Sequence, residues 1–123
     1  MPSSSKLHEF GAYQKALALF DQVVADLEEV GREPVWQRLV SQQIASADSI
    51  ASNIEEGYGR GSKIDYARFL IIARGSAQET RGRYGRLKHR LSPEVIVLRV
   101  ALCDEIIAIL TASIQRLKAQ AQT

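Results

Sequence analysis

The feature that most constrains the fold of this chain is the spacing of its large apolar residues, which recur every three or four positions in four separate stretches. In the first stretch the repeat consists of Phe10, Tyr13, Leu17, Phe20, Val24 and Leu27. This spacing places all six side chains on one face of an α-helix. Together the four stretches predict helices over residues 7–29, 35–56, 63–90 and 93–118.

Glycine, proline and serine residues mark where these helices begin and end. Gly31 and Gly57 are expected to end the first two helices, and Ser62 is a suitable N-cap for the third. Ser92 before Pro93 is the strongest helix start, because proline is well tolerated in a first turn. The connections between the predicted helices are about two to six residues long, and connections of that length make consecutive helices antiparallel. The predicted fold is therefore all-α, a single-domain up-down-up-down antiparallel four-helix bundle.

The apolar faces of the last three helices predict the rest of the core. The second helix is expected to contribute Trp36, Val40, Ile44, Ala47, Ile50 or Ala51, and Ile54. The third is expected to contribute Tyr66, Leu70, Ala73, Ala77, Thr80, Tyr84, Leu87 and Leu91. The fourth is expected to contribute Ile96, Val100, Cys103, Ile107, Leu110, Ile114 and Leu117.

The fourth helix has more apolar surface than a bundle core needs. Beside its core face lie Leu98, Leu102, Ile106 and Ile109. A wide apolar face left in water is typical of an interface, so we expect these residues to bind a second copy of the chain. The alternative is that a neighbouring helix of the same chain covers them.

Charge is distributed unevenly along the chain, although the net charge is only +2. Residues 1–59 carry a net charge of −5 and residues 60–90 carry +7. The candidate nucleic-acid-binding residues are Arg60, Lys63, Arg74, Arg81, Arg83, Arg86, Lys88 and Arg90. The alternative is that these cations pair with the acidic helices and with the dipole of their own helix.

Two further patterns leave alternatives open. Gly75, Gly82 and Gly85 lie inside the third helix, where each is unfavourable, so they either permit the close approach of a partner or are tolerated on an exposed face. The second helix carries a polar face of Gln42, Ser46, Ser49, Asn53 and Glu56. We expect a solvated surface, a hydrogen-bonded contact between subunits or the lining of a central opening.

The sequence offers little support for catalysis. His8 and His89 lie at the outer ends of their helices without the carboxylate pattern of a di-iron bundle, so neither a metal nor another cofactor is predicted. Cys103 falls on a core face and is expected to be a buried apolar residue rather than a nucleophile. The glycine-rich stretch 56–63 lacks the spacing of a phosphate loop, although its basic residues leave weak anion binding open. We expect a cytoplasmic protein that neither spans nor binds a membrane and is not an enzyme.

Several motifs occur in an order that resembles a known family. The series comprises Ser49-Ile50-Ala51-Ser52-Asn53-Ile54-Glu55-Glu56-Gly57, then Gly59-Arg60, then Phe69-Leu70-Ile71-Ile72-Ala73-Arg74-Gly75-Ser76 with Glu79. It is similar to small bacterial four-helix-bundle proteins encoded in intervening sequences of large-subunit rRNA genes. Glu55 departs from that pattern, which usually has alanine there.

The resemblance implies a cytosolic homo-oligomer with a five-subunit ring. A related group, the accessory proteins of diversity-generating retroelements, binds nucleic acid and associates with a reverse transcriptase. By motif position, Asn53, Glu56, Gly57, Arg60, Gly75, Ser76 and Glu79 are expected to shape the turn after the second helix or to join subunits. The resemblance thus favours an oligomeric accessory that binds RNA, DNA or a partner; the alternative is a purely structural assembly without nucleic-acid binding.

Overall fold

The computed structural model describes residues 4–122, which form α-helices and short 3₁₀ turns and contain no strand. The α-helices are α1 (Ser4–Glu9), α2 (Gly11–Leu27), α3 (Gln37–Tyr58), α4 (Lys63–Arg86) and α5 (Pro93–Ala121). The 3₁₀ turns are Val30–Arg32, Pro34–Trp36 and Leu87–His89. The prediction of an all-α fold is confirmed.

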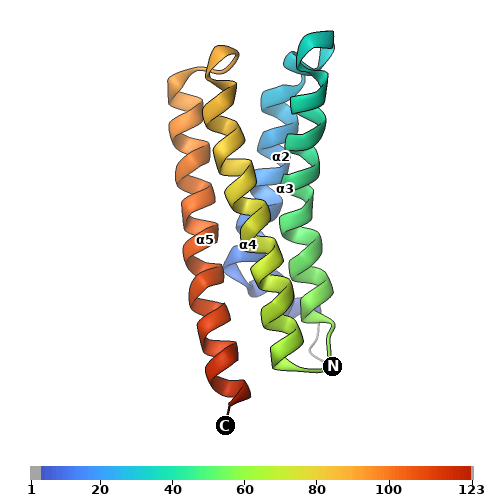
Figure 1. Ribbon diagram of the computed structural model, residues 1–123, viewed down its shortest axis with the longest axis vertical. Helices are drawn as coiled ribbons and strands as arrows, with labels where there is room; N and C mark the ends of the chain where they lie inside the picture. Colours follow the sequence, from blue (N-terminus) through green and yellow to red (C-terminus); the bar gives the residue numbers. More distant parts are fainter. Residues whose placement is uncertain (1–3, 123) are drawn as a thin grey trace.

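The four long helices α2, α3, α4 and α5 lie side by side along the long axis of the molecule (Figure 1). Helix α4 packs against both α3 and α5, and α2 completes the arrangement by contacting α3 and α5. Hydrogen bonds cross between neighbouring helices, from Tyr13 of α2 to Glu55 of α3 at 2.6 Å and between Ser49 of α3 and Ser76 of α4 at 2.9 Å. The short helix α1 packs on α2.

The first helical segment is interrupted, so the prediction of one helix over residues 7–29 is wrong. Phe10 adopts an extended conformation, with φ −70° and ψ 118°, which ends α1 at Glu9 and lets α2 begin at Gly11. Gln14 then donates a hydrogen bond from Nε2 to the carbonyl oxygen of His8 at 2.7 Å. The chain therefore turns at Phe10, whose side chain packs against the core.

Helix α2 also buries a different face from the one predicted. Leu17 and Val24, two expected core residues, are 39% and 44% exposed. The residues that α2 buries are Ala12, Tyr13, Ala16, Leu19, Val23 and Leu27. Both faces are apolar with helical spacing, and the buried one includes the small residues Ala12 and Ala16.

The predicted faces of the other helices agree better with the structure. Helix α4 buries Leu70, Ala73, Ala77, Thr80 and Tyr84, with Leu87 buried just after it. Its N-cap is also confirmed, because the Ser62 hydroxyl accepts a hydrogen bond from the backbone N–H of Asp65 at 3.2 Å. Ser92 caps α5 in the same way, accepting from the N–H of Val95 at 3.3 Å.

Helix α5 places one predicted interface residue in the core instead. Ile106 is fully buried together with Cys103 and Leu110. Because the core of the same chain covers Ile106, its assignment to a subunit interface is wrong. Leu102 and Ile109 are partly buried against the core, and Leu98 is 62% exposed.

Candidate nucleic-acid interface

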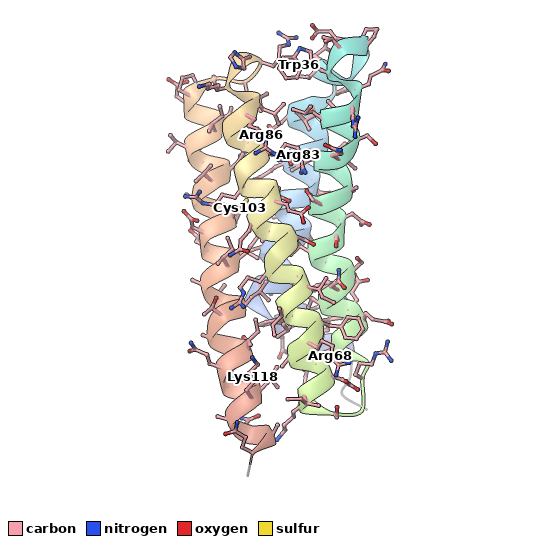
Figure 2. All side chains as sticks on the ribbon, viewed as in Figure 1. Trp36, Arg68, Arg83, Arg86, Cys103 and Lys118 are labelled. Atoms are coloured by element: carbon pink, nitrogen blue, oxygen red, sulfur yellow. The ribbon has the colours of Figure 1, made fainter. Side chains whose placement is uncertain are left out.

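The eight predicted nucleic-acid-binding residues do not form one surface. Arg60 and Lys63 precede or begin α4, whereas residues 81–90 occupy its last turns and the 3₁₀ turn that follows. Figure 2 shows Arg83 and Arg86 in the half of the molecule that holds Trp36, while Arg68 marks the opposite end of α4. The helix separates the two groups, so only the cations near its C-terminus can act together.

Several of these cations are already paired within the chain. Arg81 donates from Nε to Asp104 Oδ1 at 2.6 Å, and Arg60 donates from Nη2 to Glu56 Oε1 at 2.8 Å. Arg90 forms an ion pair with Glu33, and Arg74 donates to the Thr111 hydroxyl at 3.3 Å. Arg60, Arg81 and Arg90 agree with the alternative interpretation, in which basic residues pair with acidic ones within the molecule. Arg74 contacts a hydroxyl group instead of a carboxylate.

Arg86 and Lys88 behave differently. Both are exposed, and no carboxylate of residues 4–122 lies within ion-pair distance of either side chain. A Cβ atom built on Gly82 would lie 3.6 Å from Arg86 Nη1, so the Arg86 side chain folds back over that glycine. Two unneutralised cations therefore remain at this end of α4.

Arg83 is buried, with only 9% of its surface exposed. Its Nη1 donates to Gln43 Oε1 at 2.8 Å, to Ser46 Oγ at 3.0 Å and to the carbonyl oxygen of Gln42 at 3.4 Å. All three acceptors are neutral. Burial lowers the pKa of Arg83 from its ordinary value, and the nearby charge of Arg86 lowers it further.

A row of hydroxyl groups joins α3 to α4 beside Arg83. Ser46 Oγ lies 2.8 Å from Thr80 Oγ1, and Ser49 Oγ lies 2.9 Å from Ser76 Oγ. Ser46 and Ser49 belong to the predicted polar face of the second helix, which was expected to meet water or another subunit. Both residues hydrogen-bond to α4 of the same chain, and both also line an open depression, so part of this face is reachable from outside. A contact with another subunit stays a prediction.

The rest of that polar face has separate roles. Asn53 Nδ2 donates to the Ser49 carbonyl oxygen at 2.8 Å and to Ser49 Oγ at 2.9 Å, which adds it to the row of hydroxyls. Glu56 is exposed and pairs with Arg60. Asn53 therefore supports the α3–α4 contact, while Glu56 contributes to the turn that follows α3.

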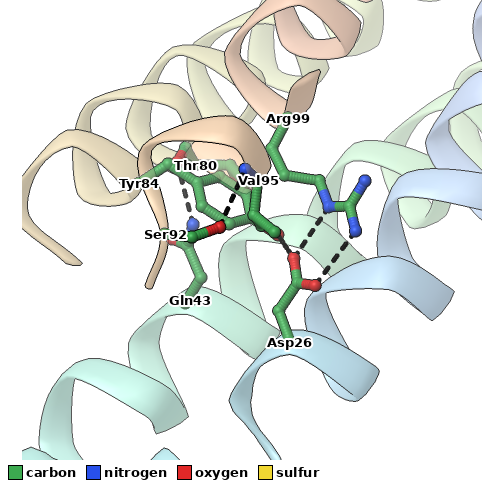
Figure 3. Close-up of polar contacts among 7 residues, drawn as sticks. All are labelled: Asp26, Gln43, Thr80, Tyr84, Ser92, Val95 and Arg99. Atoms are coloured by element: carbon green, nitrogen blue, oxygen red, sulfur yellow. Dashed lines mark hydrogen bonds and ion pairs between the residues drawn. The ribbon is translucent and has the colours of Figure 1, made fainter. Parts of the chain in front are cut away.

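Sequence reasoning missed Gln43, which is fully buried between α3 and α4. Its Nε2 donates to the carbonyl oxygen of Thr80 at 2.8 Å (Figure 3). Its Oε1 accepts from Arg83. Gln43 lies three residues before Ser46, about one helical turn away, so it is next to the predicted polar face of this helix. That spacing is the signal in the sequence that could have identified it.

An open depression lies over this polar contact, on the side where α3 meets α4. Its volume is about 400 Å³. It is lined by Gln42, Ala45, Ser46, Ser49, Ser76, Glu79 and Arg83. Two predicted site residues, Ser76 and Glu79, thus share one surface feature with Arg83.

Three further residues predicted to lie at an interface or a turn, Gly57, Gly75 and Leu98, have different surroundings. A Cβ atom on Gly57 would lie 2.7 Å from Phe69 Cβ, so this glycine permits the end of α3 to pack on the start of α4. Gly75 has open space around it. Leu98 and its neighbour Val97, 66% exposed, form an apolar patch at the start of α5.

Metal binding, membrane spanning and the state of Cys103 can each be compared with the structure of residues 4–122. These residues contain no group of three or more histidine, cysteine or acidic side chains placed to hold a metal ion. None of their helices is long and apolar enough to cross a bilayer. Cys103 is fully buried, as the sequence predicts, and burial raises the pKa of its thiol to about 12.

The sequence and the fold were both compared with known proteins. The 23S rRNA-intervening sequence protein family matches residues 8–112. The fold is similar to the crystal structure of a protein of unknown function from the S23 ribosomal protein family of Bacteroides thetaiotaomicron. The TM-score is 0.75 and the identity 25%, over 84% of this chain and 97% of the other. No curated protein matches the sequence. The chain therefore belongs to the 23S rRNA-intervening sequence protein family.

Proposed function

We propose that this protein is a non-enzymatic accessory that binds the phosphate backbone of RNA or DNA as a homo-oligomer. The observation that carries this proposal is the pair of cations Arg86 and Lys88, which no carboxylate of residues 4–122 neutralises. Exposed cations of this kind attract phosphates without reading base sequence. In this proposal the chain acts as an up-down-up-down antiparallel four-helix bundle whose rigidity fixes the cations at one end.

Self-association would multiply the basic surface. Val97 and Leu98 are 66% and 62% exposed and lie together at the start of α5, where they give a second copy an apolar surface to cover. In a ring, such as the pentamer that the sequence resemblance implies, each copy presents its own Arg86 and Lys88. Several weak phosphate contacts then act jointly, which raises the overall affinity. The same resemblance makes a reverse transcriptase of a diversity-generating retroelement a candidate partner.

The test is a salt titration of binding to RNA and to DNA. Affinity is expected to fall steeply with salt, and each phosphate contact removed lowers the slope of log affinity against log salt by about 1. Arg86→Gln with Lys88→Gln should therefore reduce both the affinity and the slope. The matched control is Arg68→Gln with Lys118→Gln, which removes the same charge from the opposite end (Figure 2). Absence of binding at low salt, or equal loss in both double variants, would contradict the proposal.

The second candidate is a structural or partner-recruiting assembly without nucleic-acid binding. The intramolecular pairing of Arg81 with Asp104 and of Arg90 with Glu33 favours it, because paired cations contribute less to phosphate binding. In that case Arg86→Glu with Lys88→Glu alters the native mass of the particle. If nucleic-acid binding is the function, the same variant loses affinity and keeps its mass.

A further inference from the structure

The depression between α3 and α4 has a surplus of hydrogen-bond donors. Arg83 has five N–H donors, and the contacts within residues 4–122 all involve Nη1. Its Nε and Nη2 have no hydrogen-bond partner in that part of the chain, and neither is among the fully enclosed atoms that lack one. Since Arg83 lines the depression, these donors are accessible to a ligand there.

The hydroxyl groups add to this surplus. Thr80 Oγ1 donates to the carbonyl oxygen of Ser76 at 2.8 Å, and the single hydroxyl hydrogen of Ser46 is taken up by Thr80 Oγ1 at 2.8 Å or by the Gln43 carbonyl oxygen at 3.3 Å, so neither residue has a donor left over. In the Ser49–Ser76 pair only one hydroxyl hydrogen lies between the two oxygens, and Ser49 also accepts from Asn53. One hydroxyl hydrogen of that pair is therefore left over beside the depression.

The charges around the depression indicate the charge of its ligand. Arg83 and the neighbouring Arg86 contribute two positive charges, and Glu79 contributes one negative charge from the lining. The local sum is +1. A buried guanidinium held only by neutral acceptors is poorly compensated, which favours an anion with several acceptor oxygens.

We infer that this depression, built by Arg83, Ser49 and Ser76, is a binding site for a singly charged phosphate group of the phosphodiester type. Arg83 donates through Nε and Nη2 to its oxygens, and the Ser49–Ser76 pair supplies one more donor. Glu79 disfavours a doubly charged phosphate, which matches the ligand to the local charge. The inference deepens the proposed function by making one phosphodiester site specific, in addition to general attraction by Arg86 and Lys88.

The test uses a dithymidine dinucleotide, which has one phosphodiester and no other phosphate, and its uncharged methylphosphonate analogue. Binding to the full-length protein is followed by amide chemical shifts at constant ionic strength. The phosphodiester should bind saturably, with shifts at Ser46, Ser49 and Ser76, and the analogue should bind at least tenfold more weakly. Inorganic phosphate, titrated separately, distinguishes a free ion from a nucleic-acid phosphodiester as the preferred source.

Three variants and a control make the inference falsifiable. Arg83→Gln should weaken binding at least tenfold, Glu79→Gln should tighten it severalfold, and Arg68→Gln at the other end of α4 should leave it unchanged. If Arg83→Gln does not fold, the double variant Ser49→Ala with Ser76→Ala decides, because it keeps Arg83 and its three acceptors. A severalfold loss supports the site, and an affinity within twofold of the parent overturns it.

The outcome is separable from that of the proposed function. Long RNA that binds with steep salt dependence while the dinucleotide and its analogue bind equally would overturn this site and leave the proposed function intact. Saturable binding of the dinucleotide without binding of long RNA or DNA would support the site and contradict the proposed function.

Discussion

Arg99 on α5 and Asp26 on α2 form a two-pronged ion pair, with Nε 2.8 Å from Oδ2 and Nη2 3.0 Å from Oδ1. The side chains are 18% and 9% exposed, so this pair is the most enclosed ion pair within residues 4–122. Tyr84 on α4 also donates its hydroxyl hydrogen to Asp26 Oδ2, at 2.8 Å (Figure 3). One carboxylate therefore ties together three helices.

Asp26→Asn should destabilise the protein by about 2 kcal/mol, because it removes charge-assisted hydrogen bonds and leaves Arg99 uncompensated in a partly enclosed place. Urea denaturation followed by circular dichroism measures the free energy of unfolding. The control is Asp104→Asn, which breaks the exposed pair with Arg81 and should cost much less. Equal costs in the two variants would show that enclosure of the Asp26 pair adds nothing.

Tyr13 should make stability depend on alkaline pH. Its hydroxyl donates to Glu55 Oε2 at 2.6 Å, and this hydrogen bond, burial and the Glu55 charge raise the pKa of Tyr13 from 10.0 to about 12. The folded state thus favours the neutral phenol, so this contribution is complete below pH 10 and is lost as pH rises from 10 to 12. Thermal unfolding of Tyr13→Phe should show a weaker pH dependence in that window, and an unchanged dependence would refute the assignment.

Gly57→Ala should destabilise the protein by about 1–3 kcal/mol, because the added methyl group would lie 2.7 Å from Phe69 Cβ and 3.0 Å from Tyr66 Cδ1. Gly75→Ala is the matched control, since nothing lies within 4 Å of its Cβ position. There alanine should stabilise α4 by up to about 1 kcal/mol. Chemical denaturation of both variants gives the comparison. A destabilising Gly75→Ala that also lowers the native mass would instead place Gly75 against another subunit.

Val97→Asp with Leu98→Asp should dissociate the proposed homo-oligomer. The two side chains are largely exposed in the single chain, so charging them costs little for folding but opposes burial between subunits. Native mass spectrometry should find a multiple of 13.6 kDa for the parent, five copies in the proposed ring, and a smaller particle for the variant. Val35→Asp, at a position 81% exposed on a 3₁₀ turn, serves as control. A parent of a single chain mass would contradict the oligomer.

The helical fold and two helix starts could be predicted from local chemistry alone. Ser62 and Ser92 act as caps through their own side chains and the next turn, so nothing distant decides their conformation. The face of α2 could not be predicted, because Leu17 and Leu19 both belong to apolar faces with helical spacing. The approach of α3 and α5 selects between the two faces, and that information lies outside the segment.

The candidate site shows the same division. The basic character of α4 is visible in the sequence. Whether each arginine is paired, buried or left unpaired depends on the residues that the neighbouring helices place beside it. Asp104 on α5 pairs with Arg81, and Gln43 on α3 accepts a hydrogen bond from the buried Arg83. No carboxylate of residues 4–122 lies within ion-pair distance of Arg86. Three arginines within six positions therefore acquire three different roles.

The hydroxyl pairs Ser46–Thr80 and Ser49–Ser76 favour one axial alignment of α3 with α4. Sliding α4 by one turn, about 5.4 Å, in one direction would set Ser49 opposite Ala73, which has no hydroxyl. Because the opposite slide would set Ser46 opposite Tyr84, neither displacement preserves the pairs. Each slide would still bring one hydroxyl opposite another, Ser76 opposite Ser46 in the first case and Thr80 opposite Ser49 in the second. The observed alignment of α3 with α4 is therefore the one that satisfies both hydroxyl pairs at once.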